Sequence, residues 1–253
     1  MSQSNAHPEP SLPGLVNLRD LAGTTTADGR SIAPGRLLRS AEPVGLDADE
    51  LETLERLGVA SRLDLRAVDE PEASPCEELD AAGVATYHVP FVELSAAPDI
   101  LDVDSDEALG RRYVHTARSN AANLYTALGI IAEDAPLGVL LHCAWGKDRA
   151  GIMIAAVLDL LDVPRERIIA DYVRTEHAVE DLLERALARL PPAQAAEARL
   201  RSHGRPIVHA REATITTYLD GLDADAGGIR GLLSEHGTDV AALSDGLKGR
   251  LLG

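Results

Sequence analysis

A short segment in the middle of the chain, HCAWGKDRAG from His142 to Gly151, brings together a thiol, two cations and a carboxyl group. A cysteine thiolate is a strong nucleophile, and it is stabilised by the N–H groups of a tight loop at the start of a helix. Arg149, which follows Cys143 in the same segment, can hold two oxygens of a tetrahedral anion at once. These residue types at this spacing predict phosphoryl transfer through a cysteine.

The elements on either side of the segment predict how it is held. An unbroken apolar run at 137–141 has the length of a fully buried parallel strand, and a helical pattern extends from Arg149 to Leu161. A loop between such a strand and such a helix directs its backbone N–H groups into a nest that binds a phosphate-sized anion. We therefore expect the phosphate to be bound by the loop residues Ala144, Trp145, Gly146, Lys147, Asp148 and Arg149.

Two other interpretations of the segment are weaker. A nucleotide-binding phosphate loop also contains Gly-Lys, but here Leu141 stands in place of a glycine and Asp148 in place of the Ser or Thr that holds magnesium. A chance spacing of cysteine and arginine would not come with a buried strand before it and a helix after it. His142 is interpreted as a hydrogen-bonded residue that supports the loop rather than as a general base.

Strand and helix patterns alternate in the first half of the chain, and helical patterns fill the second half. We therefore expect an α/β fold in which a central, mostly parallel sheet is flanked by helices and the C-terminal half is helical. Arg39 and Arg66 end predicted strands, where each either supports the site or pairs with a carboxylate. The predicted strands are 36–39, 59–65, 84–90 and 137–141, and the predicted helices are 46–57, 72–82, 108–132, 165–173, 176–190, 193–202, 209–223, 226–236 and 239–251, with an acidic loop at 92–106.

The segment resembles the HCxxGKDRxG signature of a bacterial family of cysteine-dependent tyrosine phosphatases, whose members also act on phosphoinositides. NLRDLAG at 17–23 is similar to that family's NxRDxGG element, and PGRLLRS at 34–40, LDLR at 63–66 and Asp171-Tyr172 follow in the family's order. The resemblance implies a tyrosine-phosphatase-like fold and metal-independent hydrolysis of phosphoric monoesters, without a cofactor, through a phosphocysteine on Cys143. It implies a phosphotyrosine protein as substrate, with a phosphoinositide as the alternative because Lys147 adds positive charge.

The resemblance leaves the general acid open. Conventional tyrosine phosphatases carry it on a Trp-Pro-Asp loop, but the one tryptophan here, Trp145, lies in the phosphate loop. Asp148 is the preferred acid because its neighbours place it beside the phosphate, and an acid from 99–106 is the other candidate. Ala150 stands where many such enzymes have a Ser or Thr that stabilises the departing thiolate, so slow phosphocysteine hydrolysis is expected. A phospho-binding module with weak catalysis is a second interpretation.

The domain organisation is predicted from composition and from the prolines and glycines that separate segments. Residues 1–13 are interpreted as a disordered lead-in, and 14–253 as a single phosphatase domain. Within it, 177–201 is a charged pair of helices separated by Pro191-Pro192. These helices either cover the core as a hairpin or form a mobile lid over the active site, as in some members of the resembled family.

Composition excludes several classes of protein. The 24 Lys and Arg against 41 Asp and Glu leave a net charge of −17, which argues against nucleic acid as a partner. No apolar run reaches the roughly 20 residues that span a bilayer. The first residues lack the pattern of a secretory signal, so we expect a cytoplasmic location, with leaderless export left open. Two cysteines, Cys76 and Cys143, and scattered histidines offer no metal site.

Overall fold

The computed structural model of the chain describes residues 12–91 and 103–253, and within these ranges five strands form one sheet in the order β1-β2-β5-β3-β4. Neighbouring strands are parallel except for β1 and β2, which are antiparallel. The expected mostly parallel central sheet is therefore confirmed. The strands are β1 Arg19–Asp20, β2 Leu37–Ser40, β3 Ser61–Asp64, β4 Ala85–His88 and β5 Val139–His142.

The strand register brings the carboxyl ends of the parallel strands to one edge of the sheet. Ser40 of β2 and Asp64 of β3 both pair with His142 at the end of β5, and Asp64 also pairs with His88 of β4. Because Cys143 follows His142 directly, it leaves the sheet between the ends of two neighbouring strands. Ligands of open parallel sheets bind at this edge.

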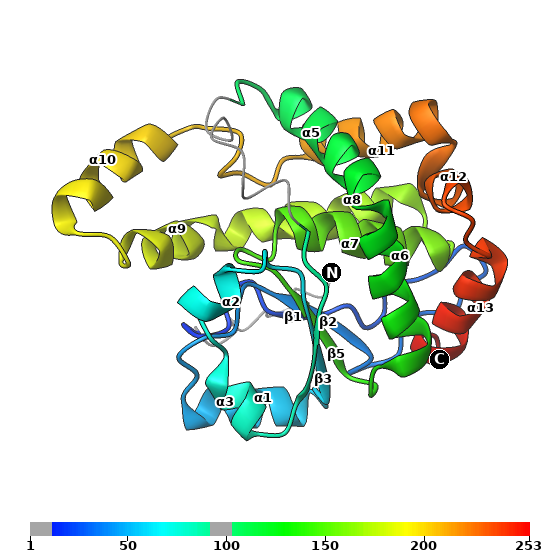
Figure 1. Cartoon of the computed structure of the whole chain (residues 1–253), viewed down its shortest axis with the longest axis horizontal. Helices are drawn as coiled ribbons and strands as arrows, with labels where there is room; N and C mark the ends of the chain where they lie inside the picture. The colour runs from blue at the N-terminus through cyan, green and yellow to red at the C-terminus, as the bar shows by residue number, and fades with distance from the viewer. Residues whose placement is uncertain (1–11, 92–102) are drawn as a thin grey trace, which may run out of the picture.

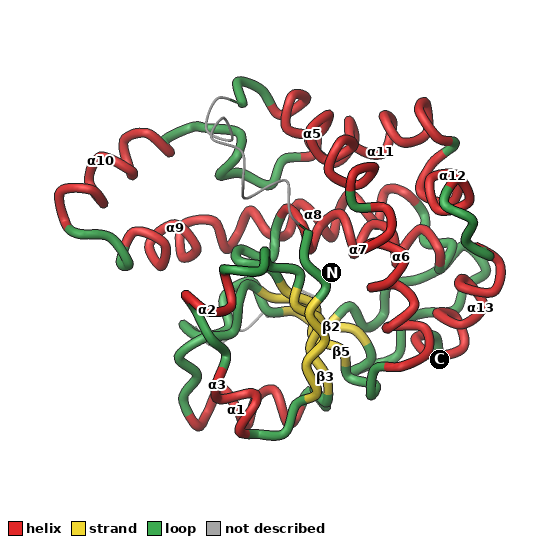
Figure 2. The backbone as a smooth tube through the Cα atoms, viewed as in Figure 1, coloured by secondary structure: helices red, strands yellow, loops and turns green. Residues whose placement is uncertain are grey.

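Helices cover both faces of the sheet, as Figures 1 and 2 show. On one face, Leu38 and Leu140 pack with Leu54 and Leu79 of two short helices, whereas Leu141 points into the larger core on the other face. Strand β5 is thus buried on both faces, as its apolar run predicts. The helices of the first face are α1 Ala48–Arg56 and α3 Glu77–Ala81, and those of the second are α5 Asp106–Ser119, α6 Ala121–Gly129, α7 Asp148–Leu160, α8 Arg165–Arg174, α11 Glu212–Ala226, α12 Gly228–Glu235 and α13 Val240–Leu251.

Two of the predicted helices are divided in the structure. The helix predicted over 72–82 is two short helices, α2 Glu70–Ala73 and α3, because Pro75 has no N–H to donate and disfavours helical backbone at Ser74. The helix predicted over 108–132 is interrupted at Asn120, which ends α5, and its last part is a π-helical turn at Ile130–Asp134. The other predicted helices are found with ends that differ by a few residues.

The chain ends beside its first hairpin. A short hairpin turns at Asp28-Gly29, with a bridge between Thr25 and Ser31, and Gly253 N donates to Ser31 O at 3.0 Å. Most of the predicted lead-in at 1–13 and of the predicted acidic loop at 92–106 lies outside the described residues. The single domain over 14–253 stays a prediction.

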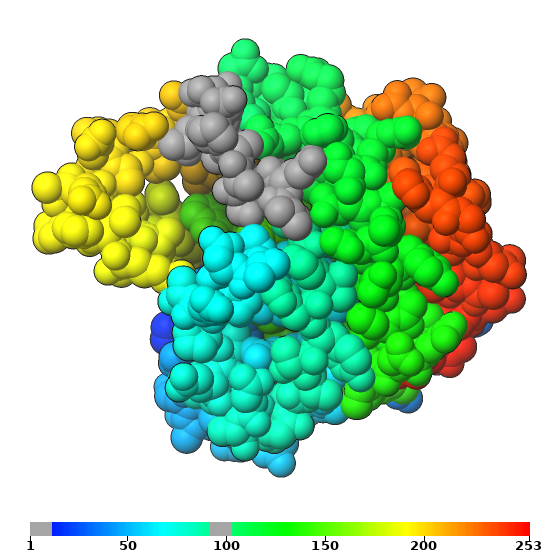
Figure 3. Space-filling model, in the orientation of Figure 1, coloured from blue at the N-terminus to red at the C-terminus, as the bar shows by residue number. Residues whose placement is uncertain are grey.

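Helices α9 Val179–Leu187 and α10 Pro192–Ser202 form an arm that stands out from the rest of the molecule, in yellow at the left of Figures 1 and 3. None of the residues of α10, all of which are described, is buried. The two ends of the arm are tied together, because the Glu176 carboxylate accepts from Ala210 N and lies within hydrogen-bond distance of His209 Nδ1, both at 2.7 Å. A mobile lid over 177–201 stays a prediction.

Candidate active site

The loop from Cys143 to Lys147 is held by its carbonyl oxygens. Asn17 Nδ2 donates to Trp145 O at 3.2 Å and to Gly146 O at 3.3 Å, and Arg39 Nη2 donates to Gly146 O at 2.5 Å. On the neighbouring residue, Glu42 N donates to Ala144 O at 3.2 Å. These contacts occupy the carbonyl oxygens of Ala144, Trp145 and Gly146. The anion nest, in which the N–H groups of the loop bind phosphate, stays a prediction.

Gly146 is required by the close approach of this loop to strand β2. Its φ is +64°, and a Cβ atom built on it would lie 2.2 Å from Ser40 O. Any side chain would therefore push the loop away from the sheet as well as adopt a left-handed backbone that L-residues avoid. The glycine lets the loop pass directly over the end of β2.

A buried carboxylate, Asp171 of α8, fixes the arginines behind the loop. Its Oδ1 lies 2.8 Å from Arg19 Nε, and its Oδ2 lies 2.6 Å from Arg39 Nη1. Burial by itself raises the pKa of Asp171, but the charges of Arg39 and Arg19 hold it below its ordinary value. The NLRD and Asp171-Tyr172 elements of the sequence thus meet in one network that also supports Gly146.

Cys143 and Arg149 lie where the sequence places them, at the two ends of the loop. The Cys143 side chain is buried, and Arg149 lies on the first turn of α7. Both Nη atoms of Arg149 donate to the carboxylate of Glu70, with Nη2 at 2.9 Å from Oε1. Burial lowers the pKa of Arg149, but the hydrogen bonds to Glu70 and the nearby Cys143 raise it above its ordinary value.

Glu70 was not predicted as a site residue. It begins α2, a few residues beyond the carboxyl end of β3, and its pKa is lowered because Arg149 outweighs the effect of burial. Its position at the carboxyl edge of a parallel sheet is the one signal in the sequence that could have identified it. The contact keeps the arginine that is expected to bind phosphate in a fixed place.

Asp148, the expected general acid, is the first residue of α7. Its Oδ1 accepts a hydrogen bond from the hydroxyl of Tyr113, and Lys147 Nζ lies 3.2 Å from the same oxygen. The other candidate acids, at 99–106, lie in part outside the described residues. Among those described, Asp106 begins α5, and its Oδ2 lies 3.8 Å from Arg211 Nε.

The Lys147 side chain is fully buried, and its ammonium group does not lie open toward the nest. Nζ donates to Ile207 O at 2.5 Å and to His209 O at 3.1 Å. These carbonyls belong to the segment that follows α10, so they could not be identified from the local sequence. The expected contact between Lys147 and phosphate stays a prediction.

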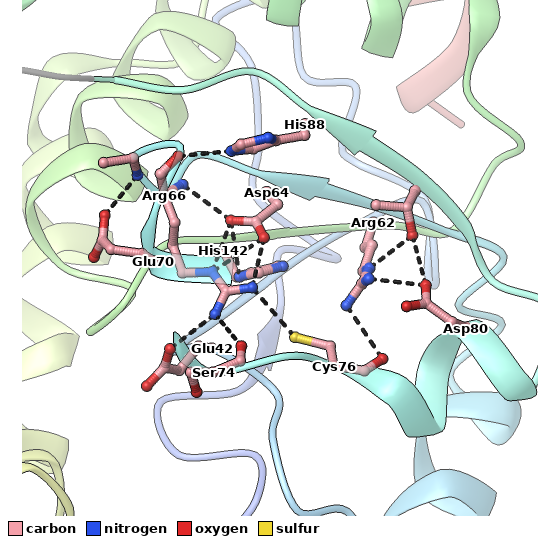
Figure 4. Close-up of polar contacts among 12 residues, drawn as sticks. Glu42, Arg62, Asp64, Arg66, Glu70, Ser74, Cys76, Asp80, His88 and His142 are labelled. Carbon is pink, nitrogen blue, oxygen red and sulfur yellow. Dashed lines mark hydrogen bonds and ion pairs between the residues drawn. The ribbon is translucent and has the colours of Figure 1, made fainter. Parts of the chain in front are cut away.

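Arg66 lies in a second buried network beside the loop (Figure 4). Its Nε is 3.0 Å and its Nη2 2.7 Å from the two oxygens of Asp64, and Nη1 donates to Glu42 Oε2 at 3.0 Å. The Arg66 Nη2 atom also lies 3.5 Å from Cys76 Sγ, and burial raises the pKa of this thiol, which keeps it protonated and unreactive. Of the two roles expected for Arg66, the structure therefore shows the pairing with carboxylates. Support of the site, through the contact of Glu42 with Ala144, stays a prediction.

His142 is buried at the end of β5 and is neutral. Neither ring nitrogen has a hydrogen-bond partner among the described residues, and Nδ1 lies 3.8 Å from Asp64 Oδ1. The supporting role expected of His142 stays a prediction, and Asp64, the carboxylate nearest to its ring, is bonded to Arg66. Burial lowers the pKa of His142 to about 4.

A cavity of about 340 Å³ adjoins the loop on the side of the arm. Trp145 and Asp148 contribute to its wall from the loop, and apolar residues of α9, among them Leu183 and Leu187, contribute from the arm. Trp145 thus lies in the wall of a cavity rather than on an open surface. The cavity offers an apolar surface directly beside the expected general acid.

Residues 12–91 and 103–253 contain no helix with the length and apolar character needed to cross a bilayer. In the same part of the chain, no group of three His, Cys, Asp or Glu side chains is placed to hold a metal ion.

Comparisons with known proteins give a consistent set of relatives. The model of the tyrosine phosphatase family matches residues 10–253. The chain is 31% identical over 211 residues to the triple specificity protein phosphatase PtpB of Mycobacterium tuberculosis, covering 69% of this chain and 71% of that protein. It is 29% identical over 242 residues to a Cupriavidus necator protein assigned as a tyrosine-protein phosphatase, covering 90% of this chain and 84% of that one.

Among solved structures, the core catalytic domain of the PP-IP phosphatase SIW14 from S. cerevisiae is similar, at 22% identity. The match covers 63% of this chain and 75% of that chain, with a TM-score of 0.39. At this score the likeness carries no argument about substrate.

Replacing Asp171 by Asn tests the network behind the loop. The change leaves Arg19 and Arg39 buried with less negative charge, so we expect the free energy of unfolding to fall by about 3 kcal/mol or more. Denaturant unfolding measures this loss. Asp80→Asn is the matched control, because it removes a similar 2.8 Å ion pair, with Arg62, from a half-exposed carboxylate. The control should lower the free energy of unfolding by less than about 1 kcal/mol. Equal decreases in the two variants would contradict the prediction.

The neutral, buried His142 predicts a pH-dependent stability. An unfolded histidine takes up a proton near pH 6.5, whereas the pKa of folded His142 is about 4. The unfolded chain therefore binds more protons between these values, so acidification favours unfolding. From pH 7 to pH 5 this group should lower the free energy of unfolding by about 2 kcal/mol. Denaturant unfolding at both pH values checks this, with His142→Gln expected to lose that part of the pH dependence. An unchanged pH dependence in the variant would show that the prediction is wrong.

Proposed function

Because this chain belongs to the tyrosine phosphatase family and is a phosphoric monoester hydrolase, we propose that Cys143 is its nucleophile. The thiolate forms an S–P bond as the P–O bond to the leaving group breaks, and Asp148 gives its proton to the departing oxygen. Water then attacks the phosphocysteine and releases inorganic phosphate. What carries the proposal is the position of Cys143 at the carboxyl edge of the sheet, followed by a loop whose carbonyl oxygens at 144–146 are bonded to Glu42, Asn17 and Arg39.

The proposed phosphate site consists of the N–H groups of 144–149 and the guanidinium of Arg149. These donors are fixed before substrate arrives, because the carbonyl contacts of the loop and the Glu70 contact of Arg149 hold them. Donors fixed in this way stabilise the charge that develops on the transferring phosphoryl oxygens. Lys147 belongs to the proposed site through its backbone N–H and its charge, while its ammonium group stays bonded to Ile207 and His209.

The proposed substrate is a phosphotyrosine protein. Cys143 is only 2% exposed, so a phosphate must reach inward to meet it, and a phenol ring is long and apolar enough to do so. The cavity beside Asp148, with Trp145 and leucines in its wall, offers a surface on which such a ring packs. The positive charge of Lys147 suggested a phosphoinositide, but its ammonium group already donates to a backbone carbonyl. A cytoplasmic location is proposed with this chemistry, because the thiol must stay reduced.

Turnover of an aryl phosphate by wild type and Cys143→Ser tests the nucleophile. With EDTA present, wild type should turn over and the variant should be slower by at least about 10³-fold. Retained turnover in the variant would overturn the cysteine mechanism. No turnover by wild type, with vanadate still bound, would instead favour the phospho-binding module, for which the buried Ala150 after the loop arginine is the motive. A burst followed by slower turnover is expected if Ala150 slows phosphocysteine hydrolysis.

The acid role of Asp148 is tested by Asp148→Asn. Loss of the proton donor should lower kcat for phenyl phosphate by about 100-fold and remove the decline in rate at high pH. The pH dependence of kcat between mildly acidic and alkaline conditions is the measurement. A variant with the wild-type pH profile would show that the acid is another residue.

A further inference from the structure

Two buried tyrosines form a chain of hydroxyl groups that ends on the carboxyl group of Asp148. The Tyr113 hydroxyl donates to Asp148 Oδ1, and the oxygen of Tyr113 lies 2.9 Å from that of Tyr172. Tyr113 comes from α5 and Tyr172 from α8, so the carboxyl at the start of α7 is supported from two other helices. Both tyrosine side chains are fully buried, whereas the Asp148 side chain is 20% exposed.

The direction of these hydrogen bonds follows from the number of protons. Oδ1 of Asp148 accepts both in the ionised carboxylate and in the acid that carries its proton on Oδ2, so the single proton of the Tyr113 hydroxyl goes to Asp148, and Tyr172 donates to Tyr113 in turn. Burial, followed by the charge of Asp148, raises the pKa of both tyrosines well above its ordinary value. The two hydroxyls therefore remain donors at every pH at which a phosphatase is assayed.

We propose that Tyr113 is a positioning residue for the proton-donating step, holding Oδ1 of Asp148 so that Oδ2 carries the proton to the leaving group, and that Tyr172 fixes the direction of the Tyr113 hydroxyl. The proposal rests on the acid role of Asp148 proposed above.

The charges around Asp148 agree with this assignment. Lys147 Nζ, 3.2 Å away, approaches the same oxygen as Tyr113, so both donors that the described residues bring to the carboxylate lie on Oδ1. Lys147 is itself held by the carbonyls of Ile207 and His209 and cannot follow the carboxyl if it rotates. The other nearby cation, Arg149, is bonded to Glu70. Oδ2 is the oxygen that these contacts leave for a substrate.

The packing of Tyr172 gives a reason for the last residue of the loop signature. A Cβ atom built on Gly151 would lie 3.0 Å from the ring of Tyr172. The glycine thus lets α8 approach α7 closely enough for the Tyr172 hydroxyl to reach Tyr113.

Tyr218 provides a matched control in the same cluster. Its ring packs edge-to-face on that of Tyr113, with centroids 6.2 Å apart, as the ring of Tyr172 also does. Within the described residues, however, the buried hydroxyl of Tyr218 has no hydrogen-bond partner. Tyr218→Phe therefore removes a hydroxyl from the cluster without changing the support of Asp148.

The test compares Tyr113→Phe, Tyr172→Phe and Tyr218→Phe on two substrates. Phenyl phosphate needs a proton on its leaving oxygen, and dinitrophenyl phosphate does not. For Tyr113→Phe we expect kcat to fall by about 10-fold on phenyl phosphate and by less than about 2-fold on dinitrophenyl phosphate, with KM unchanged. Tyr172→Phe should show the same selectivity with a loss of about 3-fold, and Tyr218→Phe should match wild type.

Thermal unfolding followed by circular dichroism verifies that each variant is folded. Equal losses of Tyr113→Phe on both substrates, or none on either, would overturn the positioning role, and so would the same selectivity in Tyr218→Phe. Asp148→Asn, measured beside them, separates the two proposals. If it distinguishes the substrates and Tyr113→Phe does not, the acid assignment stands and this inference fails. If it does not distinguish them, both fail.

Discussion

The ion pairs of Asp171 are the interaction on which the phosphate loop depends. The guanidinium groups of Arg19 and Arg39 are buried behind the loop, and that of Arg39 donates a hydrogen bond to the carbonyl of Gly146. Buried cations of this kind are stable only with a carboxylate that is equally buried. Since Asp171 belongs to α8 while the arginines belong to the sheet, the shape of the anion nest depends on the docking of α8 against β2.

This arrangement explains how a strongly acidic chain can bind an anion. The net charge of −17 is spread over the surface, where salt screens charges beyond about 8–10 Å. In the phosphate site proposed above, the attraction comes from the N–H groups of the loop and from the guanidinium of Arg149. Because these donors act at contact distance, the charge spread over the rest of the surface has little effect on them.

The sequence alone predicted the mostly parallel sheet, the buried strand before Cys143 and the helix after it, because these depend on local hydrophobic patterns. It also placed Cys143, Asp148 and Arg149 on one loop. The partners of that loop could not be predicted, because Glu70 and Tyr113 become neighbours of the site only through the tertiary fold. Lys147 shows the limit: its local context suggests a phosphate ligand, but the carbonyls that hold it come from a segment about 60 residues away.

Helix α10 lines the cavity beside the site without belonging to the core. Its residues contribute to the wall of the cavity beside Trp145, yet none of them, all being described, is buried in the core. Substitutions on this helix change the shape and charge of the wall at little cost in folding free energy. The loop is more constrained, since a side chain at Gly146 would collide with Ser40 O and loss of the Asp171 charge would leave two buried arginines unpaired. Preference for a substrate can therefore diverge between descendants of this protein while its reaction is inherited intact.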